Sequence, residues 1–223
     1  MSRCTLSQKQ VRWYTAKRGG SSKRYMDRQL RDPFVRAAAA SEYRARSSYK
    51  LIEMLDKHKL VPRDPHVCAI DCGAAPGGWS QVLAHRMPSP VPRVLAVDLL
   101  PIRPISNVHI IQGDFLSCLV KQQLASAIGR RPVSLILSDM APSFSGTKSL
   151  DALRTLALCE DVVDFAQEFL HSGGSLVLKH FMGGGELELR ERLRQMFAKV
   201  KIDKPKASRK QSAESYFVCL GKV

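Results

Sequence analysis

A glycine-rich segment, residues 67–83, has the residue types and spacing of a nucleoside-binding turn: VCAIDCGAAPGGWSQVL. An apolar run ends in Asp71, a turn at residues 73–78 follows, and an amphipathic segment begins, which predicts the first βα unit of a doubly wound sheet. The turn lacks the Gly-Lys-Ser/Thr of a phosphate-binding loop, and Ala75 stands where the dinucleotide fingerprint has its second glycine. It therefore suits an adenosyl ligand without phosphate, such as S-adenosylmethionine; a purely structural connector is the alternative. The turn residues expected at the ligand are Gly73, Pro76, Gly77, Gly78 and Trp79.

Three acids stand at the carboxyl ends of predicted strands, where sheets of this kind bind their ligands. Asp98 is suited to receive the two hydroxyls of a ribose, although a capping or solvent-facing role would also account for it. Asp114 suits a hydrogen bond from an adenine amino group, with Phe115 on the ring, or equally an N-cap for a helix. Asp139 faces the same expected cleft. Together the three acids predict a site for an adenosine-containing cofactor.

Lys179 is a cation at the end of the apolar run that begins at Ser175. Such a lysine either extends from an edge strand into water or has a function. Because this strand is expected inside the sheet, we favour a functional role for Lys179.

The rest of the pattern predicts the elements that position these residues. Strands are expected at 67–70, 94–97, 108–111, 133–137, 175–181, 200–203 and 216–220, and helices at 43–58, 115–128, 151–171 and 186–197. We therefore expect one α/β domain over residues 27–223, Rossmann-like, with a seven-stranded, mostly parallel sheet and helices on both faces. Two basic loops are expected beside the cleft, at 143–150 and at 204–210, the second without a hydrophobic anchor.

The chain carries a formal net charge of +15, and 13 of its 35 Lys and Arg residues lie in residues 1–50. A basic excess of this size favours a polyanionic partner such as nucleic acid; a solvated surface or a targeting segment are the alternatives. No apolar run approaches the roughly 18 residues that span a bilayer, so we expect no membrane span. The six cysteines form no C-x-x-C pair, which indicates small buried thiols with no role in metal binding or disulfides.

Residues 1–26 form a basic leader with seven Lys and Arg residues and no acid. This composition is typical of a mitochondrial transit peptide, and it lacks the apolar core of a secretory signal. We therefore expect the protein in the mitochondrial matrix. A disordered RNA-binding arm is the competing interpretation.

Taken together, these motifs resemble the FtsJ-like ribose 2′-O-methyltransferases, a Rossmann-like family that uses S-adenosylmethionine. The resemblance runs from about Asp32 to the C-terminus, and the matching segments are RSSYKL at 46–51, DCGAAPGGWSQ at 71–81, SDMAP at 138–142, LK at 178–179 and RKQSAESY at 209–216. Residues 31–35, residues 97–100 and the leader look most like the mitochondrial branch. That branch methylates a uridine ribose of large-subunit ribosomal RNA.

The resemblance implies a catalytic tetrad of Lys50, Asp139, Lys179 and Glu214. A lysine, with a reference pKa of about 10.4, becomes a base when burial or a second ammonium lowers its pKa. Lys179 beside Asp139 fits the base role, Lys50 would supply the second positive charge or bind a phosphate, and Glu214 would orient Lys50 or the ribose. No metal is expected. The RNA phosphates are expected to contact basic side chains around the cleft: Arg44, Arg46, Lys148, Arg209 and Lys210.

Several other functions are compatible with parts of this pattern. Expected partners are ribosomal RNA or an assembling large ribosomal subunit, but a tRNA substrate or cap-type methylation would use the same four residues. A ribosome-assembly factor that binds RNA, with catalysis secondary, would tolerate loss of tetrad residues, and all four are present. A small-molecule methyltransferase is disfavoured by the basic charge.

Overall fold

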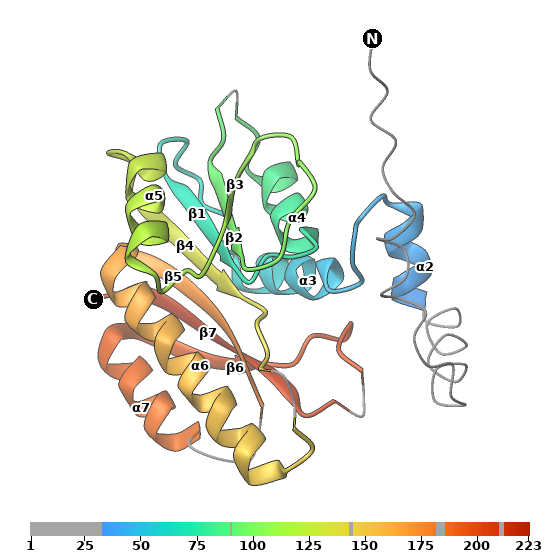
Figure 1. Cartoon of the computed structure of the whole chain (residues 1–223), viewed down its shortest axis with the longest axis vertical. Coiled ribbons are helices and arrows are strands. Elements are labelled where there is room, and N and C mark those ends of the chain that lie inside the picture. The colour runs from blue at the N-terminus through green and yellow to red at the C-terminus, as the bar shows by residue number, and fades with distance from the viewer. Residues whose placement is uncertain (1–32, 90, 143–144, 182–185, 210–211) are drawn as a thin grey trace, which may run out of the picture.

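A seven-stranded mixed sheet forms the centre of the molecule (Figure 1). The computed structural model describes residues 33–89, 91–142, 145–181, 186–209 and 212–223, so the leader at 1–26 and Lys210 lie outside the described residues. Its strands are β1 (Cys68–Cys72), β2 (Val94–Asp98), β3 (Val108–Gln112), β4 (Val133–Ser138), β5 (Leu170–Phe181), β6 (Phe197–Asp203) and β7 (Glu214–Lys222). They lie in the order β3-β2-β1-β4-β5-β7-β6, and β7 runs antiparallel to both of its neighbours. The predicted fold class is confirmed.

Helices cover both faces of the sheet (Figure 1). One face packs against α3 (Ser48–His58) and α4 (Gly78–Arg86), the other against α5 (Cys118–Ile128), α6 (Lys148–Phe169) and α7 (Glu186–Met196); a further short helix, α2 (Pro33–Ala40), lies to one side. Neighbouring strand residues point to opposite faces, so Ile136 of β4 joins the α5–α7 core and Leu137 the α3–α4 core.

The order of strands defines where a ligand binds. β1 has β2 on one side and β4 on the other, both parallel to it, so the direction of winding changes between β1 and β4. Ligands of open α/β sheets bind outside the carboxyl ends of the strands at such a switch point. β1 is buried along its whole length and ends directly in the glycine-rich turn. The turn is therefore held at the centre of the binding edge.

Several element boundaries differ from the sequence expectation. The helix expected over 43–58 begins at Ser48, and the helix expected over 151–171 already begins at Lys148 and ends at Phe169. The latter was expected to stop in a loop at 171–174, but β5 begins at once with Leu170, which is buried and paired with Val133 of β4. Because Leu170 is buried and pairs with β4, the backbone is extended at 170–174, where the glycines predicted a turn.

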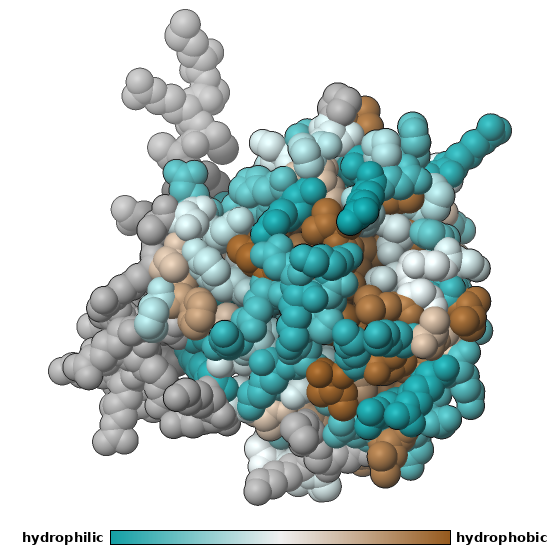
Figure 2. All heavy atoms as spheres, turned by 180° about the vertical axis from the view of Figure 1, so that it is seen from behind, coloured by the Kyte–Doolittle hydropathy of each residue, from teal (hydrophilic) through white to brown (hydrophobic). Residues whose placement is uncertain are grey.

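The face opposite to that of Figure 1 is largely hydrophilic. Figure 2 shows a band of hydrophilic side chains across the middle of this face, with apolar surface confined to separate patches. Among the described residues, no helix combines the length and the apolar character that crossing a bilayer requires.

Candidate active site and cofactor cavity

Strand register brings three side chains together at the binding edge. Ser138 of β4 pairs with Leu178 of β5, so Asp139 and Lys179 follow next to each other. Lys179 in turn pairs with Tyr216 of β7 across the antiparallel ladder. The Lys179 Nζ lies 3.3 Å from Asp139 Oδ1, and it also donates to the backbone carbonyl of Asp139 at 3.3 Å. Three adjacent strands thus fix a lysine, an acid and a tyrosine side by side.

Helix α3 supplies the second lysine of the site. Leu51, Met54 and Leu55 anchor the helix in the α3–α4 core, which directs Lys50 towards the sheet. Its Nζ lies 2.6 Å from Glu214 Oε1, and the other oxygen of Glu214 lies 3.9 Å from the Nζ of Lys179. The structure therefore brings together all four residues of the predicted tetrad, with Glu214 between the two ammonium groups.

The ionised form of Glu214 is stabilised by this arrangement. Burial by itself would raise the pKa of Glu214, but the hydrogen bond and charge of Lys50, followed by the charge of Lys179, outweigh it. The net result is a pKa below the ordinary value for glutamate. Glu214 is therefore an anion that holds the two lysines in place.

Tyr216 is a fifth member of the site that the sequence analysis did not assign. Its hydroxyl donates to Asp139 Oδ1 at 2.7 Å and accepts from the Nζ of Lys50 at 3.2 Å, so it links the two lysine–acid pairs. Burial, followed by the charges of Asp139 and Glu214, raises its pKa, which keeps the hydroxyl protonated as a donor. Its position two residues after Glu214 in the RKQSAESY motif was the available signal.

A cavity of about 790 Å³ opens beside this cluster. It extends across the carboxyl ends of β1 to β4, and the predicted residues Gly73, Asp98, Asp114 and Asp139 all line it. A smaller cavity of about 50 Å³ lies against the glycine-rich turn and is lined by Pro76, Gly78, Trp79 and again Gly73 and Asp139. Asp139 therefore connects the space for a cofactor with the lysine cluster.

The lining of the larger cavity fits an adenosyl group. Asp98 lies at the tip of β2, where its Oδ2 accepts from the Ala75 N–H and its Oδ1 from the Leu100 N–H, both at 2.8 Å. Asp114 accepts from the Leu116 N–H at 3.0 Å. The alternative that Asp114 caps the following helix is wrong, because Ser117 is the N-cap of α5. Both acids face the cavity with further lone pairs that suit ribose hydroxyls and an amino group.

Two glycines of the turn are required by close packing. Gly73 has φ +72°, and a Cβ there would lie 2.1 Å from the Cγ of Met140. Gly77 is the N-cap of α4 with φ +108°, and a Cβ there would lie 2.6 Å from Ile105. Gly77 lines neither cavity, so its part in cofactor binding is to shape the turn. Trp79 is buried and donates its ring N–H to the Ser47 carbonyl at 2.8 Å, which ties α4 to α3.

Two of the arginines predicted to contact RNA are used inside the protein. The guanidinium of Arg44 donates to the carbonyls of Pro76, Arg103 and Pro104, which fastens the loop after β2 to the glycine-rich turn. Arg46 donates to the Ala207 carbonyl and lies 5.9 Å from the ring centre of Phe34. Both arginines are half-buried at the rim of the site. Their contact with RNA stays a prediction.

The loop at 204–210 is anchored, contrary to the sequence expectation. Pro205, Ala207 and Ser208 are buried, and the Lys206 N–H donates to Glu53 of α3 at 2.7 Å. Small residues fill this anchor, which is why the sequence suggested none. Arg209 follows it half-buried. Of the other predicted RNA contacts, Lys148 is the first residue of α6, with its side chain outside the described part of the chain, as is all of Lys210.

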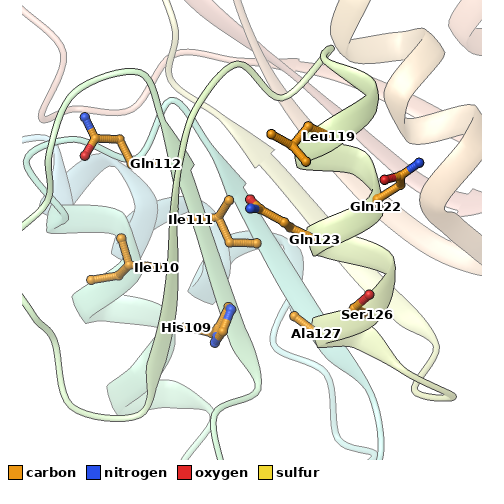
Figure 3. A pocket seen from close by; sticks show the side chains of 9 residues that line it. All are labelled: His109, Ile110, Ile111, Gln112, Leu119, Gln122, Gln123, Ser126 and Ala127. Atoms are coloured by element: carbon orange, nitrogen blue, oxygen red, sulfur yellow. The ribbon is translucent and has the colours of Figure 1, made fainter.

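A further hollow of about 710 Å³ lies between β3 and α5, away from the lysine cluster (Figure 3). Ile111 and Gln123 point towards each other across it. Its lining is mainly aliphatic and amide side chains, with His109 as its single titratable group. It shares no lining residue with the cofactor cavity.

The fold and the site define the class of protein. The sheet is doubly wound, and its cavity presents acids for an adenosyl group next to a lysine–carboxylate cluster. A protein with this combination belongs to the S-adenosylmethionine-dependent methyltransferases. Residues 43–222 match the FtsJ-like methyltransferase family, and the chain belongs to that family.

Relatives of known name agree with this assignment. The chain is 43% identical over 201 residues to the ribosomal RNA large subunit methyltransferase E of Bordetella petrii, a match that covers 88% of this chain and 94% of the relative. It is 45% identical over 212 residues to the enzyme of the same name from Sphingopyxis alaskensis, a match that covers 95% of this chain and 90% of the relative. A ribosomal RNA methyltransferase structure from Plasmodium falciparum, described as putative, superposes with a TM-score of 0.72 at 29% identity, covering 81% of this chain and 98% of that one.

Proposed function

We propose that this protein transfers a methyl group from S-adenosylmethionine to a ribose 2′-hydroxyl of large-subunit ribosomal RNA. The observation that carries the proposal is the assembled cluster of Lys50, Asp139, Lys179 and Glu214 beside the cofactor cavity, which Asp139 lines. The names of the bacterial relatives and the net charge of +15 support ribosomal RNA as the substrate.

The residues of the chain perform positioning and proton removal. S-adenosylmethionine, when bound, supplies an activated methyl group, so the protein has to align the hydroxyl and take up its proton. Lys179 is placed for the base role because its Nζ lies beside Asp139 Oδ1, which faces the cavity. Glu214 fixes Lys50 at 2.6 Å, and its other carboxylate oxygen lies 3.9 Å from the Nζ of Lys179.

The base role is tested with Lys179→Ala. The variant is expected to lose methylation of large-subunit RNA while its affinity for S-adenosylhomocysteine stays within a few-fold of the unmodified protein. Incorporation of labelled methyl groups and calorimetric binding measure the two quantities. Lys121→Ala removes a half-buried lysine of α5 that pairs with Glu168 away from the cavity, and it serves as the matched control. Retained turnover in Lys179→Ala would exclude Lys179 as the base.

The finer assignment is a uridine in mitochondrial ribosomal RNA. It is supported by the resemblance of residues 31–35 and 97–100 to the mitochondrial branch and by the acid-free leader at 1–26. Mapping ribose methylation on mitochondrial ribosomal RNA and on tRNA in cells with and without the protein tests the target. Loss of one uridine methylation in the ribosomal RNA is expected, and loss confined to tRNA would contradict it.

The leader is tested separately from the substrate. Residues 1–26 fused to a fluorescent protein are expected to direct it to mitochondria, whereas residues 33–223 fused in the same way are not. Diffuse fluorescence of the leader fusion would contradict the targeting role.

A further inference from the structure

One wall of the cofactor cavity is a single face of helix α6. The residues that α6 contributes are Arg154, Ala157, Leu158 and Asp161, spaced by three, one and three positions. This is the spacing of one helical stripe, so the four side chains point to the same side. Asp161 is the acid of this stripe, and it lines the same cavity as Asp114.

Among the described residues, Asp161 differs from the other acids of α6 in having no hydrogen-bond or ion-pair partner. Four of the five acids in the helix are held by neighbours: Glu160 and Asp164 pair with Arg192, Glu168 pairs with Lys121, and Asp151 accepts from Ser145 and Gly146. Within the described part of the chain, the structure gives Asp161 neither a hydrogen bond nor an ion pair. A half-buried carboxyl group that faces a cavity without a partner is suited to receive one from a ligand.

The surroundings of Asp161 favour a hydrogen-bond donor there. Burial, followed by the charges of Asp164, Asp114 and Glu160, raises the pKa of Asp161. Asp114 shares the cavity, and one of its carboxylate oxygens accepts from the Leu116 N–H, which leaves the other to a ligand. Two acids from different elements therefore line the same space, and a group with two N–H donors between them would relieve their repulsion.

We propose that Asp161 is a specificity-determining residue of the cofactor site, which accepts a hydrogen bond from the 6-amino group of adenine while Asp114 accepts the second. An amino group has two hydrogens, one for each acid, whereas the carbonyl oxygen of hypoxanthine has none. The pair therefore selects adenine. This proposal depends on the use of S-adenosylmethionine and does not depend on which RNA is methylated.

The test measures the affinity of each protein variant for two ligands that differ only in the 6-substituent of the base. Affinities for S-adenosylhomocysteine and for S-inosylhomocysteine, in which oxygen replaces the amino group, are measured by calorimetry. Asp161→Leu is expected to weaken binding of the adenosyl ligand about five- to tenfold, the range expected for one buried hydrogen bond. Binding of the inosyl ligand should change less than about twofold or become tighter, because a carboxyl group facing a carbonyl oxygen is lost.

Two further variants separate this role from a general effect on folding. Asp161→Asn keeps an acceptor oxygen and is expected to retain adenosyl affinity within about threefold. Asp164→Leu removes an acid from the same helix outside the cavity and is expected to leave both affinities unchanged. Equal weakening of both ligands by Asp161→Leu, or no weakening of either, would overturn the proposal while leaving the methyltransferase assignment intact. Failure of the unmodified protein to bind either ligand would overturn both.

Discussion

Tyr216 shows how one hydroxyl organises the catalytic residues. It is fully buried, donates to Asp139 and accepts from Lys50, so it sets the distance between the two lysine–acid pairs. Its ring packs beside Trp79, at 5.9 Å between ring centres, which connects the cluster to the glycine-rich turn. A residue that contacts both pairs acts by positioning them.

Tyr216→Phe is expected to lower kcat about tenfold and to leave the affinity for S-adenosylhomocysteine unchanged. The ring still fills its place, but the half-buried Asp139 loses a donor at 2.7 Å, which costs on the order of 1–2 kcal/mol. Single-turnover methylation at saturating RNA measures the effect. An unchanged kcat would show that the hydroxyl has only a structural role.

Asp71, at the end of β1, makes stability dependent on pH. Burial raises its pKa to about 7, the hydrogen bond from Ser80 at 2.6 Å opposes this, and the charges of Asp139 and Asp98 add to the rise. The folded protein therefore binds a proton between about pH 4 and pH 7 that the unfolded chain has lost. Stability contributed by this group is present at low pH and is lost as the pH rises through about 7.

Asp71→Asn is expected to remove this dependence. Between pH 5 and pH 8 the free energy of unfolding should fall for the unmodified protein by on the order of 1–4 kcal/mol more than for the variant. Urea unfolding of the cofactor-free protein at several pH values measures the difference, in which contributions from other groups cancel. Parallel curves for the two proteins would contradict the assignment.

At this scale the sequence predicts best those charged residues, Lys179 among them, that follow an apolar run. Asp98, Asp114 and Asp139 lie where predicted because an acid after an apolar run has one natural place, the binding edge. Lys50 and Glu214 were assigned only through family resemblance, since neither stands out within its own segment. A tyrosine within an apolar strand is indistinguishable from a core residue, so Tyr216 was missed. The carbonyl partners of Arg44 come from loops that no local pattern brings together.

Among the elements, helix α3 positions one lysine of the cluster. It carries Lys50, and it is fastened to the segment before Glu214 by Lys57 and His58, which bind Asp203 at 2.7 and 2.6 Å. Against α4 it packs closely enough that a Cβ on Gly78 would lie 2.7 Å from the Ser48 Oγ. That oxygen is buried and has no hydrogen-bond partner among the described residues. The position of Lys50 therefore depends on the contact between α3 and α4.

Gly78→Ala is expected to push α3 from α4, with a cost of about 1–3 kcal/mol in unfolding free energy and a loss of turnover. Adding Ser48→Ala removes the oxygen that the new methyl group meets. The double variant should therefore recover part of the unfolding free energy and part of the turnover. Chemical unfolding and methylation rates of the single and double variants measure the coupling. Strictly additive effects would show that the two side chains do not meet.

Most element types were predictable, although helix α2 (Pro33–Ala40) was not expected; element ends were not predictable. Apolar runs place all seven strands within about five residues, and the signal is strongest for the buried parallel strands β1, β2 and β4, which are continuous apolar runs. Ends depend on tertiary contacts: Leu170 extends into β5 because β4 offers it a partner, and α5 begins only after Ser117 has capped it.

For the molecule as a whole, charge is the property that governs binding of RNA. Arg209→Glu is expected to weaken RNA affinity at all sequences and to reduce the slope of affinity against salt concentration by about one to two. Arg130→Glu makes the same change of charge in an exposed residue after α5, at the opposite end of the sheet, and should leave the slope nearly unaltered. Fluorescence titrations at several salt concentrations measure both. Equal slopes for the two variants would show that charge acts without regard to position.

The place of β7 within the sheet sets the order in which an active enzyme can form. This strand follows β5 and β6 in the sequence, yet it lies between them and delivers both Glu214 and Tyr216. A nascent chain whose β7 has not yet been made therefore lacks two groups of the site. Such a chain cannot methylate RNA until β7 has left the ribosome and has inserted between β5 and β6.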